Sequence, residues 1–158
     1  MTSRKKVQNT HVGRQIRDLH GSLLDIVSVI NRPQRDATLI KEAAIPLERA
    51  LFPLLVVIDR FGPIGVVDLA DRVGRDYTTV SRQIAKLASL DLVERKVDAK
   101  DRRIRETAIS PKGKVMTRAV DAARERLGRR VFETWDPRDF DELVRLMRKF
   151  ADTIKQES

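Results

Sequence analysis

The chain of 158 residues contains no cysteine, few aromatic side chains and no long apolar run. The absence of cysteine excludes disulfides, thiolate nucleophiles and thiol redox sensors, and it fits a cytoplasmic protein. Aromatic residues make up 4% of the sequence, which argues against a platform for stacking single-stranded bases. The longest apolar run, Leu54 to Ile58, is far shorter than the roughly 20 residues that cross a bilayer, so we expect no membrane contact.

Motifs of common catalytic and metal sites are also missing. We find no glycine-rich phosphate loop and no Asp/Glu arrangement in a recognisable catalytic frame. His11 and His20 lie far apart, without a carboxylate cluster beside them, so a metal centre of usual spacing is not expected. The basic residues Arg4, Lys5 and Lys6 are not followed by the apolar stretch of a signal peptide. We therefore expect a protein without metal, cofactor or enzymatic activity.

Charge is what the sequence has in abundance. Charged residues make up 35% of the chain, and the formal net charge is +9. Lys and Arg displace condensed counterions from a phosphate backbone, so a polyanionic partner such as nucleic acid is plausible. Arg4, Lys5 and Lys6 predict either an arm that touches the DNA backbone or a disordered, solubilising tail.

Apolar residues at helical spacing predict long helices at both ends of the chain. Val12 to Ile30 forms the first stripe, and it ends before Pro33. Pro46 then opens a helical segment from about Leu47 to Phe61, in which Pro53 predicts a kink or a break near Phe52. Ser110 and Pro111 begin another long helix, and a last helix follows Asp136; their stripes contain Met116, Ala119, Val120, Ala123, Leu127 and Val131, and then Phe140, Leu143, Val144, Met147, Phe150 and Ile154.

Two short amphipathic patterns near the middle of the chain predict a helix-turn-helix. They cover Val66 to Val73 and Tyr77 to Leu90. In the turn between them, Gly74 permits a left-handed backbone and Asp76 can cap the second helix. Behind this motif, the segments 92–97 and 104–110 predict two strands joined by a polar tip, and a hairpin in this place is a wing.

The second helix of this motif divides into an apolar and a polar face. A rotation of about 100° per residue places Val80, Ile84, Leu87 and Leu90 on one side, while Thr78, Arg82, Ala85 and Ser89 lie opposite. A polar helix face is often only solvated, but the preceding helix and the following wing favour a DNA-reading face. The candidate DNA contacts on this helix are Thr78, Thr79, Ser81, Arg82 and Lys86.

The turn and the wing add further candidates for DNA contact. A hairpin tip can enter the minor groove, where the negative potential favours an inserted guanidinium. We expect Asp101 to pair with Arg103 and to direct it into that groove; the alternative is a solvated turn with weak surface ion pairs. The candidates here are Arg75, Lys100, Asp101, Arg102, Arg103 and Arg105.

Several motifs in order resemble the MarR family of bacterial regulators over about Ile45 to Val120. They are the helix-turn-helix from Leu69-Ala70 to Val93-Glu94-Arg95, the wing Asp98-Ala99-Lys100-Asp101-Arg102-Arg103, and Ile109-Ser110-Pro111-Lys112-Gly113. Pro53, where the family usually runs an unbroken helix, and Arg75, in a turn where a small or apolar residue is common, depart from its pattern.

The resemblance implies a fold, an activity and partners. The fold is mainly α-helical with a small two-stranded wing (α+β). It divides into an N-terminal arm and dimerisation helix (1–46), a winged helix-turn-helix DNA-binding domain (47–110) and C-terminal dimerisation helices (111–158). The function implied is a homodimeric transcriptional regulator of double-stranded DNA with a pseudo-palindromic operator. Usually such a protein is a repressor that is relieved by a small aromatic or phenolic effector.

The residues alone leave two alternatives open. The apolar stripes of the first and last helices fit packing between two chains, but they also fit burial within a monomeric bundle. The basic winged-helix unit could instead bind an acidic protein partner. Salt titration with duplex DNA separates these functions, because a DNA reader keeps its preference for one site while its affinity falls steeply with salt.

Overall fold

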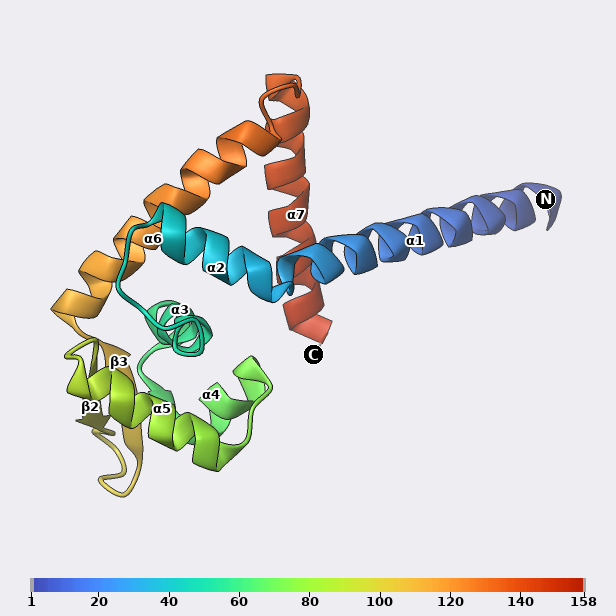
Figure 1. The fold of residues 1–158 in the computed structure, drawn as a ribbon. Coiled ribbons are helices and arrows are strands. Elements are labelled where there is room, and N and C mark those ends of the chain that lie inside the picture. Colours follow the sequence, from blue (N-terminus) through green and yellow to red (C-terminus); the bar gives the residue numbers. More distant parts are fainter. Residues whose placement is uncertain (1, 158) are drawn as a thin grey trace.

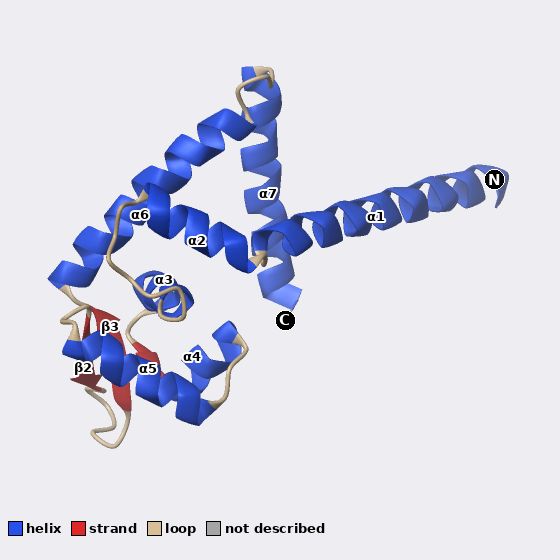
Figure 2. Ribbon diagram, in the orientation of Figure 1, coloured by secondary structure: helices blue, strands red, loops and turns tan. Residues whose placement is uncertain are grey.

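The computed structural model describes residues 2–157 and, within them, the side chains of residues 8–157. The backbone of Arg4, Lys5 and Lys6 belongs to the first helix, and their side chains lie outside the described residues. Helices dominate, with one small sheet at one end of the molecule (Figures 1 and 2). In chain order the elements are α1 (Thr2–Ile30), α2 (Pro33–Glu42), α3 (Phe52–Phe61), β1 (Ile64–Gly65), α4 (Val66–Val73), α5 (Tyr77–Ser89), β2 (Val93–Val97), β3 (Arg105–Ile109), α6 (Pro111–Val131) and α7 (Pro137–Glu157).

The core lies in the winged-helix unit, around α3. Leu54, Leu55 and Ile58 of α3 have no exposed surface, and α4, α5, α6 and the sheet surround this helix (Figure 1). Branched side chains from the neighbouring elements complete the core, because burying apolar surface at about 25 cal/mol per Å² is the main force that holds short helices together. These neighbours include Leu47, Leu51, Ile64, Leu69, Val80, Ile84, Leu87, Leu92 and Val120.

A three-stranded antiparallel sheet in the order β1-β3-β2 closes one side of this core. The predicted hairpin is confirmed, with Val93 opposite Ile109 and Val97 opposite Arg105. The short strand β1 was not predicted; Ile64 of β1 pairs with Thr107. The wing root is therefore held on both sides of β3.

The prolines differ from their predicted roles. Pro33 does more than end α1, because it stands in the first turn of the unpredicted helix α2. The expected helix from Leu47 is wrong in its first turn: residues 47–51 form an extended segment and a turn, and α3 begins at Phe52 with Pro53 in its first turn. Proline costs little there, because the first amides of a helix have no intrahelical acceptor.

The joint between the wing and α6 is tight. The Ser110 hydroxyl accepts a hydrogen bond from the Gly113 amide at 2.9 Å, which is the predicted cap of α6, and it donates to the carbonyl of Asp91. Gly113 lies directly on the wing root, since a Cβ at this position would collide with the carbonyl oxygen of Leu92. Only glycine permits this close approach.

The helices α1 and α7 lie outside this core. α6 and α7 form a V, and α1 projects away from the body (Figure 1). Their apolar stripes are exposed, including Ile16 at 60% and Val144 at 55%. The turn between α6 and α7 is packed by aromatic rings, with Phe132 5.1 Å from Trp135 and 4.5 Å from Phe140 between centroids. Among the described residues, no helix is long and apolar enough to span a membrane.

Candidate nucleic-acid interface

The turn that precedes α5 fixes where this helix begins. Gly74 has a φ of 66° and closes α4 in the left-handed conformation, as predicted. Asp76 caps α5: its carboxylate accepts from the Thr79 amide at 2.9 Å and from the Thr79 hydroxyl at 2.6 Å. These hydrogen bonds hold the pKa of the Asp76 carboxyl below its ordinary value of 3.8. The cap therefore stays ionised at neutral pH.

The two faces of α5 follow the prediction except at its C-terminal end. Val80, Ile84 and Leu87 are buried, and Thr78 and Arg82 are exposed. Leu90 is 38% exposed, which corrects its placement in the core; it follows the last helical residue, so it no longer continues the stripe. The outward direction of Thr78 and Arg82 leaves a polar face that a DNA groove can meet.

The wing tip presents cations that form no ion pair with any other described side chain. The Asp98 carboxylate accepts from the amides of Lys100 at 2.6 Å and Asp101 at 3.3 Å, and the Asp101 carboxylate accepts from the Arg103 amide at 3.0 Å. The expected ion pair between Asp101 and the Arg103 guanidinium is not among the ion pairs of the described side chains. The acids instead fix the backbone of the tip, and Lys100, Arg102, Arg103 and Arg105 are all exposed.

A groove of about 650 Å³ separates α5 from the wing. Ser81 reaches it from α5, while Arg103 and Arg105 reach it from the wing. Sequence analysis missed two side chains that line the same groove, Tyr77 and Arg95. Arg95 was overlooked because it lies in a strand rather than at the tip, and the alternation of β2 is the signal that could have found it.

Two of the predicted DNA contacts are occupied within the chain. Nη1 of Arg75 donates to the carbonyl of Ala50 at 2.6 Å and to Oε1 of Gln83 at 2.9 Å. Nζ of Lys86 lies 3.3 Å from Oε1 of Glu48. Thr79 is half-buried and bonded to the Asp76 cap, so its hydroxyl is less available than that of Thr78.

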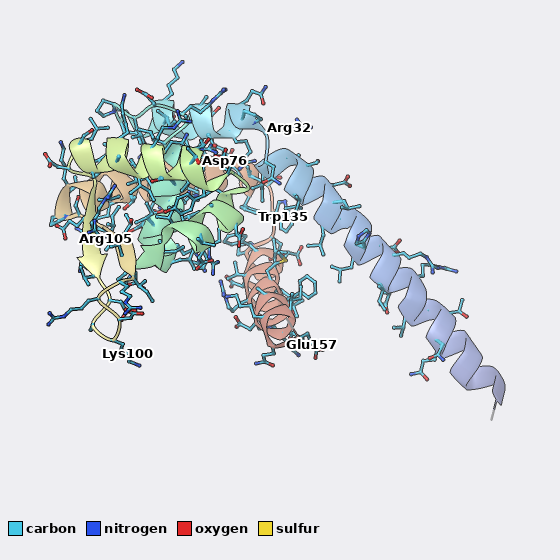
Figure 3. The ribbon with its side chains drawn as sticks, turned by 90° about the horizontal axis from the view of Figure 1, so that it is seen from below. Arg32, Asp76, Lys100, Arg105, Trp135 and Glu157 are labelled. Atoms are coloured by element: carbon cyan, nitrogen blue, oxygen red, sulfur yellow. The ribbon has the colours of Figure 1, made fainter. Side chains whose placement is uncertain are left out.

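The remaining candidates form one continuous region. Seen from below, α5 crosses the molecule with Asp76 at one end, and the hairpin extends beyond it to Lys100 (Figure 3). We call this region the DNA face; it consists of Thr78, Ser81, Arg82, Arg95, Lys100, Arg102, Arg103 and Arg105. A helix beside a protruding basic ribbon can place side chains in a major groove and an adjoining minor groove together.

A second, larger cavity lies between the winged-helix unit and the helices α1, α2 and α6. This cleft has a volume of about 1300 Å³ and is lined mostly by apolar side chains from the end of α1, α2, the start of α3 and the end of α6. Asp36 and Gly74 lie on its wall. Burial raises the pKa of the Asp36 carboxyl above its ordinary value of 3.8, against the attraction of Arg49 and Arg75.

Among the described side chains, no group of His, Cys, Asp and Glu could hold a metal ion. His11 and His20 are both exposed on α1. The described structure therefore contains a mostly apolar cleft and, on the DNA face, a set of exposed cationic side chains.

Comparison with known proteins agrees with this geometry. A family model described as HVO_A0114 matches residues 46–107. The chain is 33% identical over 106 residues to an uncharacterized HTH-type transcriptional regulator, YxaD, from Bacillus subtilis (strain 168); the match covers 65% of this chain and 74% of the relative.

Solved structures share the fold over nearly the whole chain. A MarR transcriptional regulator from Methanosarcina mazei Go1 has a TM-score of 0.64 and 21% identity, covering 89% of this chain and 99% of that chain. A MarR family protein from Bacillus stearothermophilus has a TM-score of 0.67 and 17% identity, covering 90% and 97%. Both YxaD and the Methanosarcina mazei protein are named as transcriptional regulators. The chain therefore belongs to the HTH-type, DNA-binding transcriptional regulators, and its winged helix-turn-helix fold is that of solved MarR family proteins.

Proposed function

We propose that this regulator binds a pseudo-palindromic operator as a homodimer and represses transcription until a small aromatic or phenolic effector occupies the cleft. The observation that carries the proposal is the DNA face, where the capped helix α5 turns Thr78 and Arg82 outward beside a wing of unpaired cations. The residue ranges 1–46, 47–110 and 111–158 then act as N-terminal dimerisation region, DNA-binding domain and C-terminal dimerisation region.

The roles within the DNA face follow from the chemistry of each side chain. The exposed guanidinium of Arg82 can fork onto O6 and N7 of guanine, and the nearby Thr78 hydroxyl can reach a base edge or a phosphate. Arg95, Arg105 and Ser81 line the groove beside α5, where a phosphate backbone would pass between the two DNA grooves. Arg102 and Arg103 at the wing tip suit a narrow minor groove.

Exposed apolar stripes on α1 and α7 support the homodimer. None of the α7 side chains is buried within the chain, although Phe140, Val144, Met147 and Ile154 lie on one face of this helix. An amphipathic helix that covers no core of its own is stable only when another surface covers it. A second copy of the chain supplies the same stripes through a two-fold axis.

A two-fold dimer determines the geometry of the operator. Two α5 helices would enter successive major grooves on one side of the duplex, about 34 to 36 Å apart. Half-sites of inverted sequence with this spacing are therefore expected.

Selection from a random pool of duplexes is the experiment that tests DNA reading. The wild-type protein should enrich an inverted repeat, and its affinity should fall steeply with salt while its site preference remains. Arg82→Ala should reduce discrimination by about 1 to 3 kcal/mol through loss of a bidentate base contact. Lys86→Ala should weaken all duplexes alike, since Lys86 can exchange the exposed Glu48 for a phosphate.

Arg118→Ala is the matched control, because Arg118 is an exposed arginine on α6, across α3 from α5 (Figure 1). It should leave discrimination unchanged. Weak, sequence-blind binding by the wild-type protein would contradict the proposal and would favour a module that binds an acidic protein. Equal losses on selected and random duplex for Arg82→Ala and Lys86→Ala would contradict the division of roles.

The effector proposal rests on the position of the cleft. A mostly apolar cavity with a few charged groups is the usual setting for a small ligand. Because this cleft touches α3, the end of α4 and the ends of α1 and α6, a ligand there contacts the DNA-binding and dimerisation regions together. Titration with 4-hydroxybenzoate should lower the affinity for the selected duplex. Val57→Trp replaces a lining residue with a larger one that fills part of the cleft, so it should abolish that response. An unchanged response in the Val57→Trp variant would place the effector elsewhere.

A further inference from the structure

Arg75 occupies an unusual place for a side chain in a DNA-binding turn, because its guanidinium is hydrogen-bonded within the protein. It follows Gly74 in the turn between α4 and α5, and it is half-buried. One nitrogen, Nη1, donates both of its hydrogen bonds within the chain, to Ala50 O at 2.6 Å and to Gln83 Oε1 at 2.9 Å. A guanidinium used in this way is not directed at a phosphate. We call these contacts the Arg75 bridge.

The two acceptors belong to different parts of the winged-helix unit. Ala50 lies in the turn that leads into α3, and Gln83 lies on α5 between the exposed Arg82 and the buried Ile84. Since α5 has no flexible joint after its Asp76 cap, a bond at Gln83 acts on the rotation of the whole helix. The Arg75 bridge therefore connects the start of α3 to the residue next to the predicted base contact.

The other link between the same two segments is weaker. The Glu48 and Lys86 side chains lie 3.3 Å apart, but they are 64% and 53% exposed. An exposed ion pair contributes little to stability, while a hydrogen bond from a charged donor that is partly buried, like the one to Gln83, contributes more. Among the described contacts between the turn before α3 and α5, the half-buried Arg75 bridge is thus the stronger one.

The Arg75 bridge also borders the cleft. Gly74, directly before Arg75, lines the cleft, as do Asp36 of α2 and Phe52 and Pro53 at the start of α3. Asp36 attracts Arg75 electrostatically. The cleft wall and the Arg75 bridge are therefore connected in two ways: through the backbone between Gly74 and Arg75, and through the attraction between Asp36 and Arg75.

We propose that Arg75 is a positioning residue that fixes the orientation of α5 through Ala50 and Gln83, and that it transmits changes at the cleft wall to the DNA face instead of contacting DNA. The inference rests on the proposed function, because orientation of α5 matters only if this helix reads a sequence. A ligand in the cleft that binds Asp36 or shifts the turn before α3 would change the hydrogen bond between Arg75 and Gln83. This change would turn Arg82 away from its base.

Gln83 makes this proposal testable without changing the charge of the protein. Arg75→Met and Gln83→Leu should each lower affinity for the selected duplex about tenfold through loss of a charge-assisted hydrogen bond. Affinity for random duplex and the slope of affinity against salt should stay at wild-type values. The double variant should lose no more than Arg75→Met alone, because Arg75→Met already breaks the contact with Gln83. Gln83→Glu keeps an acceptor for Arg75 but adds a negative charge, so it should weaken all duplexes alike while its discrimination between selected and random duplex stays at the wild-type value.

The opposite pattern would overturn the proposal. A phosphate contact at Arg75 predicts that Arg75→Met reduces the salt slope by about 1 and weakens all duplexes, while Gln83→Leu has no effect. If Arg75→Met fails to fold, the Gln83 pair of variants still decides. If the wild type selects no duplex, the proposed function fails, and amide hydrogen exchange then tests the positioning role by itself. Gln83→Leu should speed exchange in α5 and leave exchange in α6 unchanged. If α5 exchanges at the same rate in Gln83→Leu as in the wild type, the positioning role is refuted.

Discussion

The winged-helix unit and the outer helices differ in what covers their apolar side chains. In α3, Leu54 and Leu55 are completely buried, whereas Ile16 of α1 and Val144 of α7 are more than half exposed. The unit therefore contains its own source of stability, whereas the described residues of the outer helices bury little apolar surface within the chain. Folding and assembly should respond separately to mutation, so each change below tests whether they can be divided in this way.

The largest effect on folding is expected in the centre of the unit. Leu55→Ala removes a fully buried side chain that neighbours cannot replace, so the free energy of unfolding should fall by about 2 to 5 kcal/mol. Urea denaturation followed by circular dichroism measures this loss. A loss below 1 kcal/mol would show that the unit is less tightly packed than its burial indicates.

The largest effect on assembly is expected on α7. Val144→Asp places a charge in the exposed stripe, where covering by a second copy would desolvate it, so the dissociation constant of the dimer should rise by about a hundredfold or more. Sedimentation equilibrium measures this constant. The matched control is Val115→Asp, since Val115 of α6 is 67% exposed and lies outside both stripes. Equal association of the two variants would remove α7 from the interface.

A smaller effect is expected at the edge of the unit. Glu48→Gln removes the exposed partner of Lys86, so stability should change by less than about 0.5 kcal/mol. Affinity for every duplex should rise a few-fold, because Lys86 no longer has to leave a carboxylate before it meets a phosphate. Fluorescence anisotropy with random duplex measures the gain, and Glu125→Gln on α6 is the control. Weaker binding would mean that Glu48 holds Lys86 in place for DNA.

Local signals in the sequence predicted much of the unit correctly. The Gly74 turn and the Asp76 and Ser110 caps depend on neighbours within a few residues, so the chain order alone reveals them. The buried face of α5 was predicted for the same reason, since helical periodicity places Val80, Ile84 and Leu87 together.

Errors arose where distant contacts decide the outcome. Pro33 and Pro53 each start a helix, but the same residues inside a helical pattern equally predict a break, and only packing against the core distinguishes the two. The strand β1 is too short to show alternation and exists because β3 lies beside it. The prediction that Arg75 contacts DNA was made without its acceptors, Ala50 and Gln83, because a turn motif does not reveal them.

The contact of Gly113 with the carbonyl of Leu92 has a mechanical consequence. Because this contact leaves no free space, we expect α6 and the winged-helix unit to rotate together as one rigid body. In the proposed dimer, a change in the angle between the two α6 helices would therefore rotate both α5 helices by the same amount. The protein would then tolerate little variation in the distance between half-sites.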